Sequence, residues 1–222
     1  MILECHTEGS GSALEAELSA IVLALKDHIS HCDHSSESSL FSSIDLSLGS
    51  SGDEFRIRTS SYTLTVSQVS DPIIRANFVQ RCLALWPVST PTLLEICCTS
   101  SGVTAMELIQ ALSTEALNCV DRVMLRETAG DFFAALFEQN ESATVPLLPG
   151  LQEITLQRVH LVPLIQLQIR VVLKLRKEAG VPIRRLKLDH CSNMSRSWAH
   201  EFQSDFGVEL SYDDETQQQS RL

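Results

Sequence analysis

The side chains best suited to chemistry lie in a short segment near residue 30. This segment holds His28, His31, Cys32 and His34. His28 and Cys32 are four residues apart, so on a helix they share one face and could hold one Zn²⁺ between them. Histidines near the C-terminus of a helix are also stabilised by its dipole, without any metal. Because no second ligand pair stands at a recognised spacing, we expect no cofactor, although the sequence leaves metal binding here open.

A pair of adjacent cysteines, Cys97 and Cys98, is the second candidate. In a strand, adjacent side chains point to opposite faces, so Cys98 is expected in the core and Cys97 on the sheet surface. A cysteine nucleophile needs a base and an orienting group nearby, and the sequence identifies neither. The phosphate-binding, dinucleotide-binding, serine-hydrolase and zinc-protease motifs are also absent from the sequence. We therefore expect that the protein is not an enzyme.

A third candidate is a row of variable residues that alternate with apolar ones in three segments of the second half. Alternation of this kind predicts strands whose variable side chains share one surface of a sheet. The predicted partner-binding surface consists of Arg122, Met124, Arg126, Glu153, Thr155, Gln157, Arg185, Lys187 and Asp189. Its arginines suit an acidic or phosphorylated protein segment, because a guanidinium binds carboxylate and phosphate through two nitrogens. The alternative is a solvated sheet whose charges compensate one another.

Composition limits the classes of protein to consider. The 222 residues can form one sizeable core, and the net charge of −11 argues against nucleic acid as a partner. The seven cysteines are scattered and do not suggest a disulfide framework, so we expect a reducing compartment, the cytoplasm or nucleus. No segment approaches the roughly 18 apolar residues of a membrane span, so we expect no membrane association.

The elements that would position these residues alternate along the chain. Apolar periodicity predicts helices over residues 12–31, 72–86, 104–112, 129–137, 164–179 and 195–206. It predicts strands over residues 41–48, 55–57, 62–66, 93–98, 120–125, 151–156, 183–188 and 208–210. Turn residues between the first two strands indicate a hairpin. From residue 93 onward each helix is long enough to connect parallel strands, so we expect a parallel sheet with helices packed alongside.

The strand segments also share one pattern, in which apolar residues take the first, fourth and sixth positions. It begins at Leu93, Val120, Leu151 and Ile183, at intervals of about 30 residues, close to the length of a leucine-rich repeat. The predicted fold is an α/β solenoid of this type, with a curved parallel sheet on one side and helices on the other. We expect irregular repeats or a cap over residues 1–90, continuous with a repeat region over 91–211, and a disordered acidic and polar tail over 212–222.

The segment Leu186-Lys-Leu-Asp-His-Cys-Ser-Asn-Met194 resembles the cysteine-containing leucine-rich repeat of F-box proteins. With Trp198 and Phe202, the region from 93 to 210 resembles the C-terminal half of the F-box family of mushroom-forming, basidiomycete-type fungi. The resemblance implies a protein–protein interaction module, the substrate-recognition half of a ubiquitin-ligase receptor. The F-box itself is not present, so contact with the ligase adaptor depends on an F-box outside this chain. The alternative is a leucine-rich-repeat regulator, an inhibitor or activator of another enzyme unrelated to ubiquitin.

Overall fold

The computed structural model describes most of the chain as an α/β fold. The described residues are 2–6, 12–32, 43–48, 55–58, 63–67, 69, 71–85, 93–98, 104–126, 130–142, 146–193 and 196–212. The strands are β1 (Ile2–His6), β2 (Ser43–Leu48), β3 (Phe55–Arg58), β4 (Thr63–Ser67), β5 (Leu93–Cys98), β6 (Arg122–Arg126), β7 (Glu153–Gln157), β8 (Arg185–Asp189) and β9 (Glu209–Tyr212). The helices are α1 (Ser12–Cys32), α2 (Pro72–Leu83), α3 (Ala105–Leu112), α4 (Gly130–Ser142), α5 (Pro163–Glu178) and α6 (Arg196–Phe206), with a short 3₁₀ turn, η1 (Glu115–Leu117).

All of these strands belong to one sheet in the order β1-β4-β3-β2-β5-β6-β7-β8-β9. From β2 through β5 to β9 each strand pairs with the next in parallel. The predicted hairpin is confirmed, because β2 and β3 pair antiparallel, and β3 then pairs antiparallel with β4. Strand β1 lies parallel to β4 at the edge of the sheet and was not predicted from the sequence.

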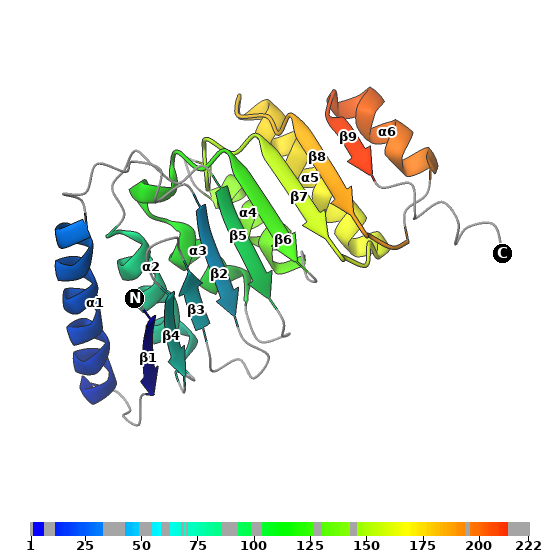
Figure 1. The fold of residues 1–222 in the computed structure, drawn as a ribbon. Coiled ribbons are helices and arrows are strands. Elements are labelled where there is room, and N and C mark those ends of the chain that lie inside the picture. The colour runs from blue at the N-terminus through cyan, green and yellow to red at the C-terminus, as the bar shows by residue number, and fades with distance from the viewer. Residues whose placement is uncertain are drawn as a thin grey trace.

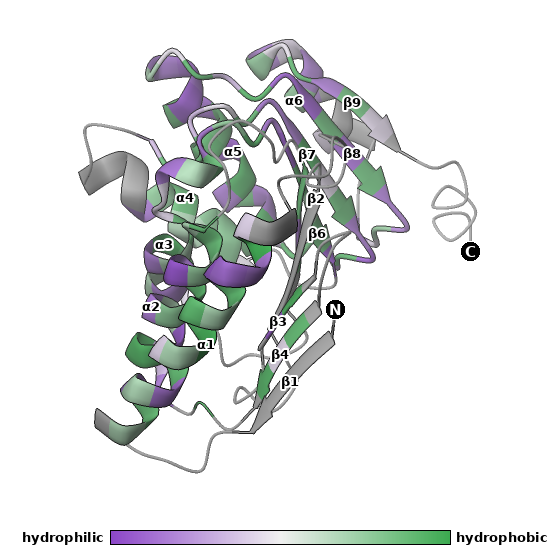
Figure 2. Ribbon diagram, turned by 60° about the vertical axis from the view of Figure 1, so that its left-hand side comes forward, coloured by the Kyte–Doolittle hydropathy of each residue, from purple (hydrophilic) through white to green (hydrophobic). Residues whose placement is uncertain are grey.

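The six described helices lie on the same face of the sheet (Figures 1 and 2). The reason is the direction of the connections between parallel strands. Each strand–helix–strand crossover moves the same way along the sheet, from β1 to β2, from β4 to β5, and then one strand at a time to β9. Crossovers of this kind are almost always right-handed, so steps in one direction place every helix on one side. The other face, which we call the open face, is left without helices from the described part of the chain.

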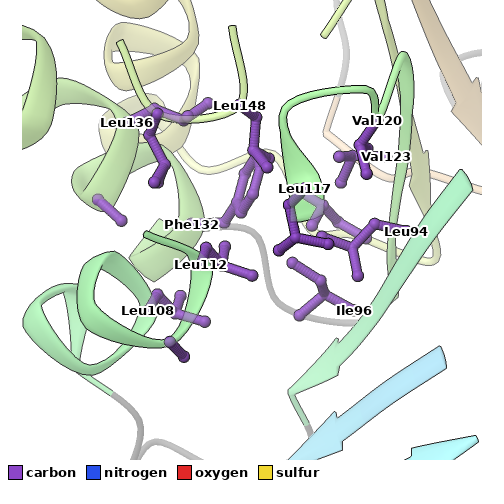
Figure 3. Close-up of a cluster of buried hydrophobic side chains, with 14 of the residues drawn as sticks. Leu94, Ile96, Leu108, Leu112, Leu117, Val120, Val123, Phe132, Leu136 and Leu148 are labelled. Carbon is purple, nitrogen blue, oxygen red and sulfur yellow. The ribbon is translucent and has the colours of Figure 1, made fainter. Parts of the chain in front are cut away.

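The helix-facing side of the sheet is built from two rows of apolar residues in register. One row runs through Leu94, Val123, Ile154, Leu186 and Leu210, and the other through Ile96, Leu125, Leu156 and Leu188. These side chains are at most 7% exposed. Figure 3 shows Leu94, Ile96 and Val123 of the sheet in one cluster with Leu112 of α3 and Phe132 of α4, with Leu117 between them.

The register corrects one part of the predicted repeat. Leu93 lies opposite Arg122 and not opposite Val120, so the position equivalent to Val123 is Leu94. The pattern was placed two residues too late in β5. A shift of two residues leaves Ile96 on the helix-facing side, because alternation indicates the face of a strand and not its register with the next strand. From β6 to β8 the predicted positions are confirmed, since Val123, Ile154 and Leu186 are buried and pair in register.

Side chains at the start of two helices explain where those helices begin. Asp71 caps α2 by accepting hydrogen bonds from the backbone nitrogens of Ile73 and Ile74. Thr104 caps α3, and the Glu107 carboxylate accepts a hydrogen bond from the Thr104 backbone nitrogen at 2.9 Å, which completes a capping box.

The predicted helices and strands are confirmed in kind and order. The predicted tail from 212 onward lies outside the described residues, except for Tyr212, which ends β9.

Candidate functional site

The open face carries the nine residues predicted to bind a partner. Along β6, β7 and β8 they alternate with buried residues, so they point away from the helices. They are Arg122, Met124 and Arg126 on β6, Glu153, Thr155 and Gln157 on β7, and Arg185, Lys187 and Asp189 on β8. Strand pairing brings them together as three rows across the sheet, such as Met124, Thr155 and Lys187.

Glu153 is the most enclosed charge among the nine residues of this surface, with a side chain only 13% exposed. Its Oε1 lies 2.7 Å from the ammonium of Lys187, and its Oε2 lies 3.0 Å from the guanidinium of Arg185. Burial raises the pKa of Glu153, but the hydrogen bonds and positive charges of Lys187 and Arg185 outweigh burial and hold this pKa below its usual value. Arg185 also reaches Glu209 on β9 through its Nε, at 3.0 Å. One carboxylate thus joins two cations, and Arg185 extends the chain of charges to the edge of the sheet.

Four other side chains of the surface, those of Arg122, Arg126, Gln157 and Asp189, are also engaged. Arg126 donates to Glu95 of β5 at 3.0 Å, and Gln157 donates to Asp189 at 2.6 Å. Arg122 lies 3.4 Å from the carboxylate of Asp121. The basic side chains expected to receive an acidic client therefore each contact a carboxylate of this protein. Charge compensation of this kind is also what the alternative of a solvated sheet predicts.

The centre of the surface is uncharged. Met124 and Thr155 lie opposite each other in register and are half-buried. Arg122 and Arg126 flank Met124 along β6, and Glu153 and Gln157 flank Thr155 along β7. A less polar centre within a charged rim is the usual arrangement of a protein interface.

Three carboxylates of this network, those of Glu95, Asp121 and Glu209, were not among the nine predicted site residues. Glu95 precedes them on β5, and Glu209 follows them on β9, where each supplies a carboxylate to an arginine. The short alternation Val208-Glu209-Leu210 was the available signal for Glu209, because its flanking residues are buried. The pairing of each arginine with its carboxylate depends on the register of neighbouring strands. This register cannot be read from the alternation of residues in the sequence.

The chain turns in the same way after β7 and after β8. Arg158 and His190 follow these strands with left-handed φ values of 57° and 51°. The next residues, Val159 and Cys191, are buried, and the Cys191 thiol donates to the carbonyl of Leu156. His160 and Ser192 then form a parallel bridge, with the His160 Nδ1 at 2.7 Å from the Ser192 hydroxyl. Two segments about 30 residues apart thus share one backbone path.

The histidine and cysteine candidates fall largely outside the described side chains. His28 is half-buried in α1, whereas the side chains of His31 and Cys32, and all of His34, lie outside the described residues. Cys97 and Cys98 belong to β5, but their side chains are likewise outside the description. In the described ranges, no group of three or more His, Cys, Asp or Glu side chains is arranged to hold a metal ion.

Arg176 is placed differently from what its sequence neighbours indicate. It lies in a basic run of α5 with Arg170, Lys174 and Lys177, whose side chains are exposed or half-buried, yet its own side chain is fully buried. Its guanidinium donates to the carbonyls of Leu147, Leu148 and Leu151, at 2.8, 3.0 and 3.4 Å. Burial lowers its pKa to about 10. Arg176 therefore holds the segment between α4 and β7 and is part of the scaffold, not of the site.

Two further findings concern the chain as a whole. Over the described residues, no helix combines the length and apolar character that crossing a bilayer requires. No protein family, curated protein or solved structure matches this chain.

Proposed function

We propose that this chain is a leucine-rich-repeat-like protein-interaction module, and that its open face binds a protein client. The observation that carries the proposal is the one-sided covering of the sheet. Helices bury one face (Figures 1 and 2), while the opposite face presents mostly polar side chains in register on β6, β7 and β8. A surface of this kind is wide and shallow, which suits another protein better than a small substrate.

The repeat character of the proposal is supported by β7 and β8 and the segments that follow them. Arg158 and His190 occupy equivalent left-handed positions, and Val159 and Cys191 occupy equivalent buried ones. In a repeat protein each unit closes its core on its neighbour, and here the Cys191 thiol reaches back to Leu156 of the preceding strand. The resemblance of Leu186–Met194 to a cysteine-containing repeat concerns these same residues.

In the proposed complex, Met124 and Thr155 form the centre of the contact. Arg122 and Arg126 beside them are about half exposed, with side-chain values of 49% and 46%, so carboxylates or phosphates of a client can reach them. Because Arg126 already contacts Glu95, an acidic client would have to compete with that carboxylate. Exposed ion pairs contribute at most about 1 kcal/mol, so the exchange of partners has a small cost.

In its narrower form, the proposal is that the module is the substrate-recognition half of an F-box-like ubiquitin-ligase receptor. It rests on the resemblance of the region from 93 to 210, and it requires an F-box elsewhere in the full protein or its complex. In that arrangement the open face would select the client, and the ligase would act on the client's lysines.

The test begins with site-specific photocrosslinking in native-type cells. A photoreactive amino acid replaces Met124 in the full chain, and in a second experiment Ala20, which is exposed on α1. The protein crosslinked at 124 and not at 20 is identified, purified and titrated against the wild type. Met124→Glu/Thr155→Glu is expected to weaken its binding at least about tenfold, as expected at the centre of an interface.

Ala16→Glu/Ala20→Glu is the matched control, because it adds the same charges at exposed positions of α1. Equal binding by the wild type and the open-face variant would show that the client does not use this surface. The narrower proposal predicts that the captured client is ubiquitinated in cells that hold the wild type. It also predicts that the client is degraded more slowly in cells that hold the open-face variant. A client whose turnover is independent of the module contradicts the ubiquitin-ligase part alone.

A further inference from the structure

The solvent-facing side of α5 carries an apolar surface, in addition to the buried side that packs on the sheet. The buried side of this helix is formed by Ile169, Val172 and Leu173, as expected for a helix packed on a sheet. On the opposite side, Leu164 is 64% exposed and Leu167 is 57% exposed. Half-buried Val171 and Leu175 continue the same line, so the four residues follow helical spacing. We call Leu164, Leu167, Val171 and Leu175 the α5 stripe.

The α5 stripe differs from the other exposed apolar residues of the described chain. Leu23, Ile73 and Met106 are exposed to a similar degree, but each stands on a different helix. Single exposed apolar side chains are ordinary on a protein surface. Four residues in line along three turns of one helix form a continuous surface about 17 Å long, at 1.5 Å per residue.

The two sides of the α5 stripe differ in charge. On one side, Ile165 and Gln168 lie against Gly130 of α4. On the other side, Arg170 is paired with Glu201 of α6. Lys174 and Lys177 lie on this α6 side of the stripe by helical spacing and are exposed.

The two lysines are weakly engaged. The Lys174 ammonium is 4.0 Å from the carboxylate of Glu178, and the Lys177 ammonium is 3.4 Å from the carbonyl of Asp205. Both contacts are exposed and long, so a carboxylate from a partner can replace them at small cost. The surface therefore combines an apolar line with available positive charge on one flank.

We propose that the α5 stripe docks an amphipathic α-helix of a partner protein, with leucine-type residues facing the stripe and carboxylates facing Lys174 and Lys177. A partner helix of three or more turns matches the length of the stripe and would pack along it as one helix against another. This site is on the helical side of the molecule, so it does not depend on the function proposed for the open face.

The charges favour this occupant over two others. A second copy packed antiparallel about a twofold axis would set Lys174 and Lys177 against the N-terminal half of the other copy's α5, residues 163–170, which holds no carboxylate to pair with them. An anionic membrane would meet Glu178 and Glu201 beside the lysines, on a chain whose net charge is −11. A partner helix can instead place its carboxylates only where the lysines are.

The probe is a pair of synthetic fluorescent peptides, each a helix of about five turns with leucines at heptad a and d positions. One peptide carries glutamates at e and g, and the other carries lysines there. Fluorescence anisotropy with the full chain is expected to give at least about tenfold tighter binding for the glutamate peptide. Lys174→Glu/Lys177→Glu is expected to invert this preference, which a purely apolar contact would not do.

Leu164→Ser/Leu167→Ser is expected to weaken the binding of the glutamate peptide at least about tenfold, because the stripe is the apolar centre of the contact. Ile73→Ser/Met106→Ser removes equally exposed residues from α2 and α3 and is expected to change binding by less than about twofold. Absent or equal binding of the two peptides, or an equal loss in both serine variants, overturns the proposal. So does a wild-type dimer, or adhesion to phosphatidylserine vesicles, that Leu164→Ser/Leu167→Ser abolishes.

Discussion

Arg75 and Glu107 join α2 to α3 through an ion pair that the protein buries. The Arg75 Nε lies 3.0 Å from the Glu107 Oε1, and the two side chains are 5% and 9% exposed. Arg75 also donates to the carbonyl of Val69, and the second carboxylate oxygen of Glu107 accepts from the Thr104 backbone nitrogen. A single carboxylate thus caps α3 and neutralises a buried guanidinium.

Removal of this carboxylate is expected to destabilise the fold strongly. Glu107→Ala leaves Arg75 buried without its counterion, and we expect a loss of about 3–5 kcal/mol in the free energy of unfolding. Urea denaturation of the variant and the wild type measures the loss. The double variant Arg75→Met/Glu107→Leu removes both charges and is expected to lose clearly less. A cost of the single variant no larger than that of the double variant would contradict this account.

Glu153 is expected to make stability depend on pH in the acid range. In the folded protein its pKa is below the usual 4.5, because the hydrogen bonds and positive charges of Lys187 and Arg185 outweigh the effect of burial. A carboxyl of this kind adds stability above its unfolded pKa and loses it as the pH falls through its folded pKa. The urea midpoint of the wild type should therefore exceed that of Glu153→Gln at pH 7, with a difference that shrinks below pH ~4. A difference that is independent of pH would refute the assignment.

Two glycines are expected to respond in opposite directions to alanine. A Cβ on Gly150 would lie 2.6 Å from the backbone oxygen of Asn118, so Gly150→Ala should destabilise by about 1–3 kcal/mol. Among the residues that the structure describes, a Cβ on Gly130 would meet only side-chain atoms at 3.9 Å or more, so Gly130→Ala should stabilise α4 by about 0.5 kcal/mol. Thermal melts of both variants compare the two, and destabilisation by both would show that the space beside Gly130 is misjudged.

Arg176 is expected to resist replacement by lysine. Its planar guanidinium donates to three carbonyls, and a lysine ammonium cannot reach the same three positions from a buried stem. Arg176→Lys should therefore lower stability by about 2 kcal/mol, the cost of unsatisfied buried groups. The conservative exposed change Arg184→Lys is the control, and an equal melting temperature for the two variants would contradict the proposed role.

Cys82 is expected to be protected from alkylation in the folded protein. Its side chain is fully buried, and burial raises the pKa of the thiol to about 12 despite the charge of Arg81. Iodoacetamide reacts with the thiolate, so labelling at pH ~8 should require unfolding. Mass spectrometry of peptides labelled with and without urea tests this, with half-exposed Cys119 as the internal comparison. Rapid labelling of Cys82 in native buffer would show that the α2 region opens locally.

The sequence by itself determined the kinds of element and their order. Alternating apolar residues in β6, β7 and β8 identify the side that meets the helices, because strand side chains point to opposite faces in turn. Asp71 and Thr104 mark the starts of α2 and α3, because each side chain accepts hydrogen bonds from backbone nitrogens two or three residues further along the chain. Such local contacts can be read from the sequence. A parallel sheet followed from the same order, since crossover helices separate the strands.

Only the tertiary structure decided which residues meet across the sheet. The neutralisation of Arg126 by Glu95 and of Arg185 by Glu153 and Glu209 depends on the register of strands far apart in the chain. The alignment of β5 with β6, which pairs Leu94 with Val123, was likewise decided by the tertiary structure. The burial of Arg176 depends on where the segment 147–151 passes over α5. The physical reason is common to these cases, because periodicity records which side of its own element a residue occupies, whereas long-range packing selects its neighbours.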